Sequence, residues 1–419
     1  MRILLLSQFF EPEPTFKGLQ FAKALQGYGH SVEVLTGFPN YPGGRVYDGY
    51  RVRLWQKEEM DGVPVMRTAL YPSHDRSTLR RVANYASFAL SASTVGAALT
   101  GRPDIVYAYH PPATVGLPAV LCKWFKGAKL VYDIQDLWPD AVGVTGMVGG
   151  SLPLRAIGAW CRFVYRSADQ LVVLSPGFRE RLVERGVPRE KIELIYNWSN
   201  EGAVQRCERD AALATSLGFE GKLNVVFAGT MGAAQDIGTV LQAARLLRDS
   251  LPGVQFVFVG GGTDAASLKA QAERSELTNV RFLPHRPVEQ MGPLFALADV
   301  LLVHLKDDPL FRITIPSKTQ VYMAMGKPIL MGVAGDAADL VARAKAGILC
   351  QPGSAAALAE GVRRFVEMGA DGRAEMGAAG YEFYQRELSM AAGVRRFVDV
   401  FERVHPGVSQ LTRRGEGQA

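Results

Sequence analysis

The sequence predicts an α/β protein with two domains, each built on a parallel sheet flanked by helices. The chain has 419 residues, which is too long for one ordinary hydrophobic core. Short apolar runs of strand length alternate with longer amphipathic segments in both halves of the chain, as in doubly wound sheets. The 44 glycines suit the many tight turns that connect such strands and helices. A composition of 48% hydrophobic and 21% charged residues is typical of soluble globular proteins.

The first half begins with a strand at 2–7, a helix at 18–27 and a strand at 31–36, which together make one βαβ unit. The intervening loop carries Lys17 and Gly18 at the start of a helix, where anions bind in such sheets. Further strands are expected at 105–109, 130–132, 170–174 and 192–195, and helices at 77–100 and 152–168. Together these elements predict a first Rossmann-like domain.

The second half repeats the alternation independently. Strands are expected at 223–228, 254–259, 280–283, 300–304, 329–331 and 347–350, and helices at 237–247, 291–296, 336–344, 355–368 and 387–404. The predicted domains are 1–199, a linker at 200–222, a second domain at 223–385, a C-terminal helix at 386–408 that packs back toward the first domain, and a disordered tail at 409–419.

The stretch from 312 to 332 carries the clearest candidate for an anion site. It places Arg312, Thr314, Ser317 and Lys318 at the start of a short helix, and Pro328 and a buried strand follow. The free N–H groups and the dipole at a helix start favour a phosphate, and the lysine adds a mobile cation. The alternative is a surface turn before an ordinary crossover helix.

His110 is the main candidate for a catalytic residue in the first half. It ends a predicted strand, and sites in open parallel sheets lie at the carboxyl ends of strands. Asp133, Asp136 and Asp140 follow the next strand. These acids could polarise the histidine, bind sugar hydroxyls or hold a metal, or they could cap the next helix.

The formal charge of +6 comes from the first 200 residues, which hold 23 lysines and arginines against 17 acids. The excess favours an anionic partner such as a membrane surface or a phosphorylated acceptor, or it is ordinary solubility charge. The helix at 77–100 has Arg76, Arg80 and Arg81 beside an apolar face, which suits either an interfacial helix or a crossover helix. The charge pattern does not predict nucleic-acid binding. No secretory signal or spanning segment is predicted.

Several motifs resemble family 4 glycosyltransferases with the GT-B fold, in particular bacterial enzymes of surface-polysaccharide assembly that transfer N-acetylfucosamine or related aminosugars. The matching stretches are QFFEPEP, GLQFAKAL, GHSVEVLTGFPNYPGG, PDIVYAYHPP, VYDIQDLWPD, LIYNWSN, FAGTMGAAQDI, VFVGGG and IPSKTQVYMAMGKPIL. They occur in the right order over most of the chain.

The resemblance implies a nucleotide-sugar donor in the second domain and an acceptor on the first. His110, Asp136 and Lys318 are its implied catalytic residues. The implied donor ligands are Lys17, Gly18, Asn197, Gly229, Met231, Gly232, Gln235, His285, Arg286, Arg312, Thr314, Ile315, Pro316, Ser317 and Gln320. The chain departs from the family pattern at Ile313 and Val321, which stand where many members have the two glutamates of an E-x7-E motif. Gln320 or Thr314 could substitute for them. Met231 also stands near the place of a usual basic residue.

The expected activity is metal-independent, retaining transfer of an N-acetylated hexosamine or deoxyhexosamine from a UDP-sugar to a lipid-linked or saccharide acceptor. No cofactor is expected apart from the donor itself. The protein is expected in the cytoplasm, with peripheral contact at the inner membrane through its basic first domain. Two alternatives stay open: a nucleotide-sugar epimerase of the same fold, and a non-catalytic nucleotide-sugar-binding protein.

Overall fold

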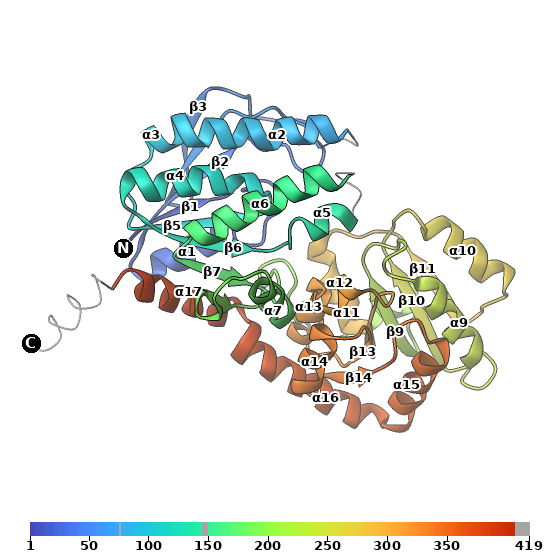
Figure 1. Cartoon of the computed structure of the whole chain (residues 1–419). Coiled ribbons are helices and arrows are strands. Elements are labelled where there is room, and N and C mark those ends of the chain that lie inside the picture. The colour runs from blue at the N-terminus through green and yellow to red at the C-terminus, as the bar shows by residue number, and fades with distance from the viewer. Residues whose placement is uncertain (75–76, 145–149, 407–419) are drawn as a thin grey trace, which may run out of the picture. The chain divides into compact units, whose positions relative to one another are not determined.

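A computed structural model describes residues 1–74, 77–144 and 150–406, and the predicted tail lies outside these ranges. The chain divides into two compact units (Figure 1). The first contains residues 1–195 and the segment from Val394 onward, and the second contains residues 196–393. The first unit is therefore discontinuous in sequence, because the chain returns to it after completing the second.

The first unit is built on an eight-stranded sheet in the order β3-β4-β2-β1-β5-β6-β7-β8. Its strands are β1 (Arg2–Leu6), β2 (Ser31–Gly37), β3 (Trp55–Met60), β4 (Val63–Thr68), β5 (Ile105–His110), β6 (Lys129–Ile134), β7 (Gln170–Val173) and β8 (Ile192–Leu194). β1 pairs in parallel with both β2 and β5, so Ile3 lies between Val32 and Ile105. This is the point where the strand order reverses, and ligand sites form at such points.

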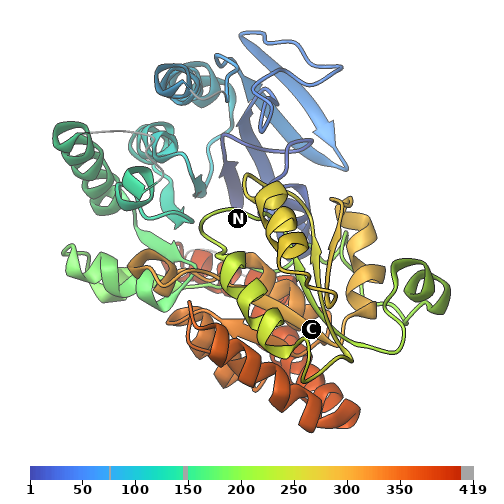
Figure 2. The ribbon, with the colours of Figure 1, turned by 90° about the vertical axis from the view of Figure 1, so that its right-hand side faces the viewer.

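An antiparallel pair, β3 and β4, forms one edge of this sheet (Figure 2). The two strands turn at Asp61 and Gly62, which have φ angles of 49° and 81°, as a tight hairpin requires. This hairpin was not among the predicted elements. Every side chain of β3 is at least partly exposed, so the strand lacks the apolar alternation that would have revealed it.

Helices cover the sheet of the first unit. They are α1 (Leu19–Gly27), α2 (Thr78–Ser91), α3 (Ala97–Leu99), α4 (Gly116–Lys126), α5 (Asp140–Val144), α6 (Ser151–Ser167) and α7 (Pro176–Glu184), and α17 (Met390–Val404) joins them through its last part. The helix predicted at 77–100 is interrupted by a π-helical stretch at Ala92–Gly96. The sequence did not predict α4, which contains Gly116 and Pro118 in its first turn.

The second unit is built on a parallel six-stranded sheet in the order β11-β10-β9-β12-β13-β14, the arrangement of a dinucleotide-binding fold. Its strands are β9 (Leu223–Ala228), β10 (Val254–Val259), β11 (Val280–Leu283), β12 (Val300–His304), β13 (Ile329–Gly332) and β14 (Gly347–Leu349). β9 lies between β10 and β12, so the strand order reverses at the carboxyl end of β9.

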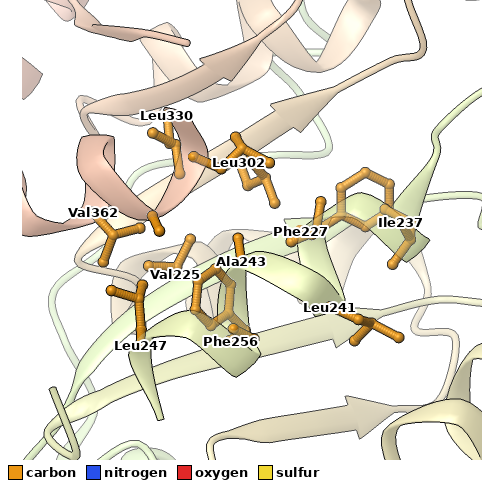
Figure 3. Close-up of a cluster of buried hydrophobic side chains, with 14 of the residues drawn as sticks. Val225, Phe227, Ile237, Leu241, Ala243, Leu247, Phe256, Leu302, Leu330 and Val362 are labelled. Atoms are coloured by element: carbon orange, nitrogen blue, oxygen red, sulfur yellow. The ribbon is translucent and has the colours of Figure 1, made fainter. Parts of the chain in front are cut away.

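The core of the second unit lies between one face of this sheet and the helices α9 (Ile237–Leu247) and α15 (Ala355–Glu367) (Figure 3). Phe227 and Phe256 extend from the sheet to meet Leu241, Leu247 and Val362. The other helices are α8 (Ala211–Leu217), α10 (Ala265–Arg274), α11 (Met291–Leu297), α12 (Pro309–Arg312), α13 (Ser317–Ala324), α14 (Asp336–Arg343) and α16 (Gly369–Phe383). α8 falls inside the segment predicted as a linker. No helix in the described ranges is long and apolar enough to cross a membrane.

Candidate functional site

Two glycine turns meet at the carboxyl ends of β9 and β10. Gly229 has a φ of 135° and Gly260 a φ of 132°, a region that side-chain-bearing residues rarely adopt. A Cβ atom on Gly260 would lie 2.3 Å from the carbonyl oxygen of Gly229. The turns are joined by hydrogen bonds from the Gly229 N–H to Val259 (2.9 Å) and from the Met231 N–H to Gly261 (2.7 Å). Glycine is required here because the two backbones touch.

A cavity of about 540 Å³ opens beside these turns. It is lined by Val204, Ala228, Gly229, Thr230, Gln235, Val259, Gly260, His285, Arg286, Val288, Met291, Phe295, Leu305, Pro316, Ser317, Lys318, Val321 and Tyr322. The lining contains a lysine, an arginine and a histidine, and it contains no aspartate or glutamate. Such a lining suits an anion attached to a largely apolar or planar group.

Lys318 lies at the start of α13, within this cavity. Its Nζ is 3.7 Å from the centroid of the Phe227 ring, and a Cβ atom on Gly229 would lie 3.3 Å from it. Burial lowers the pKa of Lys318 from 10.5 to about 7, because an ammonium ion loses hydration there. An anion placed beside it would restore the charge. The lysine, the glycine turn and the first N–H groups of α13 thus form one anion-binding corner.

The structure brings six predicted donor ligands together around this cavity, Gly229, Gln235, His285, Arg286, Pro316 and Ser317, and with them the predicted catalytic residue Lys318. Gln235 also accepts a hydrogen bond from the Gly232 N–H (3.1 Å) and so orders the turn. The apolar and aromatic walls were not predicted, among them Phe295 and Tyr322. The Tyr322 hydroxyl accepts from the Ala228 N–H (3.2 Å). In the sequence, Phe295 and Tyr322 cannot be distinguished from ordinary core residues.

The remaining predicted residues of the second unit do not line the cavity. Met231 belongs to the hydrophobic core, and Ile315 is buried. Arg312 forms a two-pronged ion pair with Asp307, at 2.8 and 2.7 Å. Asn197 and Gly232 are also absent from the lining.

Neither proposed substitute for the absent glutamates reaches the cavity. Thr314 donates its hydroxyl hydrogen bond to the Leu310 carbonyl oxygen (2.8 Å), and Gln320 is buried. Val321 itself lines the cavity. The wall at this place is therefore apolar, and hydroxyl groups of a ligand would have to bind elsewhere.

In the first unit, the loop after β1 is organised by inward-facing charges. Glu13 is buried and accepts backbone hydrogen bonds from Asn40 (2.6 Å), Tyr41 (2.6 Å) and Phe10 (3.2 Å). Burial is the largest influence on its carboxyl group and raises its pKa from 4.5 to about 7. A Cβ atom on Gly18 would lie 2.3 Å from the Glu11 carboxylate oxygens, so a larger residue there would displace the Glu11 side chain.

Lys17 has a different environment from the one a donor ligand needs. Its side chain is 1% exposed, and its Nζ lies 2.6 Å from a carboxylate oxygen of Asp133. Tyr107 donates to the same oxygen at 2.5 Å, and the ring of Phe397 lies 4.8 Å from the Nζ. The ammonium group is thus committed to an internal ion pair, which joins the loop to β6. The sequence could not reveal this pairing, because the partners are 116 residues apart.

A second cavity, of about 360 Å³, lies at the carboxyl ends of β1 and β5 in the first unit. It is lined by Phe9, Pro14, Thr15, Phe16, Tyr41, His74, Tyr85, Tyr109, Pro111, Pro112, Asp136, Trp138, Ala141 and Val142. Asp136 is the one carboxylate of this lining. Aromatic faces with a single carboxylate suit a sugar ring, which has apolar faces and hydroxyl edges.

His110 lies behind the wall of this second cavity. It is 1% exposed, and its ring centroid is 5.6 Å from that of Trp138 and 5.8 Å from that of Tyr132. Burial lowers its pKa to about 3, so the imidazole is neutral at physiological pH. Neither ring nitrogen has a hydrogen-bond partner within the described ranges. A buried imidazole without a side-chain partner is costly, and a water molecule or a group of a bound ligand would satisfy it.

Comparison with protein families accounts for both units. Residues 19–198 match the family described as "Glycosyl transferase 4-like domain", and residues 210–383 match "Glycosyl transferases group 1". Together the two matches cover most of the chain. The chain belongs to the family 4 glycosyltransferases, which have the GT-B fold.

Individual relatives agree with this assignment. The chain is 27% identical to the putative colanic acid biosynthesis glycosyl transferase WcaI of Escherichia coli, over 95% of this chain and 99% of that protein. It is 27% identical to the probable glycosyltransferase WbjE of Pseudomonas aeruginosa, over 64% and 67% of the two chains. Among solved structures, Anabaena HepE in complex with UDP superposes with a TM-score of 0.68 at 16% identity, over 96% of this chain and all of that one. The structural likeness shows the shared fold.

Proposed function

We propose that this protein is a retaining glycosyltransferase that moves an N-acetylated hexosamine or deoxyhexosamine from a UDP-sugar to a lipid-linked or saccharide acceptor during surface-polysaccharide synthesis. The observation that carries the proposal is the acid-free cavity of the second unit, with Lys318 beside the Gly229 turn. The relatives named for colanic acid biosynthesis and the solved complex of HepE with UDP support the same assignment.

The cavity of the second unit supplies what cleavage of a sugar–phosphate bond needs. Negative charge develops on the departing diphosphate, and the Lys318 ammonium and the N–H groups at the start of α13 stabilise it as it forms. Because burial lowers the pKa of Lys318 to about 7, binding of the diphosphate increases the fraction of this lysine that is protonated. In this proposal the protein supplies the positive charge itself, and no metal ion is required.

The cavity of the first unit is assigned to the acceptor. Trp138 and Tyr85 offer flat faces for a sugar ring, and Asp136 offers a carboxylate for a hydroxyl group. His110, neutral and next to the cavity-lining Trp138, is assigned to position the reacting sugar with a hydrogen bond. In this proposal the acceptor is lipid-linked, and the reaction takes place at the inner face of the cytoplasmic membrane.

Nucleotide choice tests the proposal first. Isothermal titration of the whole protein with UDP, GDP and TDP should give tight binding for UDP, with at least tenfold weaker binding for the other two. A matched titration of Lys318→Ala should abolish most of the UDP affinity. A preference for GDP would redirect the proposal to a GDP-sugar donor, since one relative is a GDP-mannose-dependent alpha-mannosyltransferase at 25% identity.

The reaction itself is tested with UDP-N-acetylhexosamines and membrane extracts that contain lipid-linked acceptors. Transfer of labelled sugar to the lipid fraction, with retained anomeric configuration, is the expected result. Epimerisation of the donor without an acceptor would support the epimerase instead. Tight UDP binding without turnover on any acceptor would support a binding protein.

A further inference from the structure

We propose that the outer face of helices α2, α4 and α6 in the first unit docks on an anionic lipid bilayer. These helices carry exposed aromatic and aliphatic side chains and many basic residues, and they carry no acidic residue. The inference deepens the proposed function, because it assigns the surface through which the protein would reach a lipid-linked acceptor.

The three helices form one layer over the sheet. α2 packs on α4 and α4 packs on α6, and they run side by side in Figure 1. Each helix connects two parallel strands of the same sheet, so the three helices point in the same direction. Their carboxyl ends therefore lie along one edge of the layer.

The charged residues of these three helices are all basic. The helices contain 14, 11 and 17 residues, among which there are seven lysines and arginines and no aspartate or glutamate. At the frequency of the whole chain, 41 acids in 419 residues, about four acids would be expected. By contrast, α7 in the same unit contains Glu180 and Glu184.

Lys123 of α4 forms an ion pair with Asp169 (2.6 Å), whereas the arginines of α6 are not neutralised. Arg155, Arg162 and Arg166 are exposed on α6, and none forms an ion pair within the described ranges. Lys126 donates to the carbonyl oxygens of Thr100 (2.7 Å) and Gly101 (2.8 Å) and keeps its charge. Such basic groups attract the anionic lipids of a membrane surface.

Apolar side chains are exposed at both ends of the layer. Phe125 and Trp124 at the end of α4 are 81% and 57% exposed, and Leu152 at the start of α6 is 74% exposed. Trp124 packs against Phe163 of α6, with ring centroids 5.9 Å apart. Tryptophan and phenylalanine beside arginine are the residues that bind at the headgroup level of a bilayer.

The layer also borders the proposed acceptor site. Tyr85 belongs to α2 and lines the aromatic cavity of the first unit. A bilayer against this layer would thus bring membrane-bound acceptor sugars near that cavity. A second copy of the chain is a poorer occupant than a bilayer, because two such faces would repel each other.

Vesicle co-sedimentation tests the inference. The whole protein should bind phosphatidylcholine vesicles that contain phosphatidylglycerol, and it should bind pure phosphatidylcholine vesicles weakly. Each basic residue near a membrane contributes about fivefold to partitioning, so the triple variant Arg155→Gln, Arg162→Gln, Arg166→Gln should lower binding on the order of 100-fold. The matched control is Arg245→Gln, Arg274→Gln, Arg364→Gln, which removes the same charge from the second unit and should bind like the wild type.

A second variant tests the apolar contribution. Phe125→Glu with Leu152→Glu should abolish binding to the anionic vesicles, while Leu246→Glu, at an exposed leucine of α9, should not change it. Equal loss in both control variants, or no loss in either layer variant, would overturn the inference. So would a layer variant that keeps vesicle binding but dissociates a dimer in sedimentation velocity.

The two proposals fail separately. The layer variants should bind UDP with the affinity of the wild type, because the nucleotide site lies in the second unit. Vesicle binding without UDP binding would refute the proposed function alone. Normal UDP binding without vesicle binding would refute the docking face alone.

Discussion

The two units share a strand arrangement and differ in the chemistry at its reversal point. In the first unit β1 lies between β2 and β5, and in the second unit β9 lies between β10 and β12. In each unit a cavity opens at the carboxyl ends of these strands. The cavity of the first unit is aromatic and has one carboxylate, Asp136, whereas that of the second is basic and has none. One backbone plan can thus present a surface for a neutral ring or a surface for an anion, and the loops decide which.

The largest expected effect tests the basic cavity. Lys318→Ala should lower turnover by roughly 10²–10³-fold, as the loss of one charge-stabilising donor does. Initial rates with saturating donor measure it, and Lys269→Ala, on an exposed lysine of α10 in the same unit, is the matched control. Equal rates for Lys318→Ala and the control would show that the cavity of the second unit does not stabilise the departing diphosphate through Lys318.

His110→Asn should come next, with a loss of about 10²-fold in turnover and little change in UDP affinity. The reason is that the imidazole lies in the first unit and, among the residues that the structure describes, has no hydrogen-bond partner for either ring nitrogen. Rates, UDP titration and the thermal midpoint should be measured together. A lowered midpoint with unchanged turnover would make the residue structural, and the first cavity would lose its proposed catalytic group.

The pH dependence of UDP affinity sharpens the contrast. Burial lowers the pKa of Lys318 to about 7, and a bound diphosphate raises it again, so binding takes up a proton above pH 7. The affinity should therefore fall by up to tenfold per pH unit as the pH rises from 7 toward the pKa in the complex. Calorimetry at several pH values measures this slope. Lys318→Ala should flatten it, and a steep slope in that variant would assign the proton to another group.

The smallest expected effect belongs to the aromatic cavity. Asp136→Asn should raise the KM for the acceptor about tenfold, since one charge-assisted hydrogen bond is weakened. The UDP affinity should stay the same. Asp48→Asn, at an exposed aspartate outside the cavity, is the control. An effect on UDP rather than on the acceptor would reverse the assignment of the two cavities.

The alternation of strands and helices was predictable because buried parallel strands are short, continuous apolar runs. The edge hairpin β3–β4 was not, because its first strand, WQKEEM, is polar on both faces. α4 was missed because Gly116 and Pro118 occupy its first turn. Local pattern therefore predicts the elements whose packing is regular, and it fails at edges and at irregular helix starts.

The candidate site was predictable where a backbone requirement shows in the sequence. Gly229 and the residues that open α13 could be recognised on this basis, since glycine turns and helix starts leave local signals. The ion pair of Lys17 with Asp133 and the walls formed by Phe295 and Tyr322 depend on long-range packing. The sequence around Lys17 does not show whether it binds a ligand or an internal partner. The sequence around Phe295 and Tyr322 does not show whether these side chains line a cavity or fill the core.

Because the C-terminal helix returns to the first unit, the two units differ in how they can be separated by truncation. Phe397 on α17 packs on Phe21 and Tyr107, with ring centroids 5.2 and 5.4 Å apart. Residues 196–393 are one continuous segment, so two cuts in the chain separate them from the rest. The first unit loses this aromatic contact in any simple truncation, so isolating it calls for a circular permutant that joins residues 394–406 to Met1.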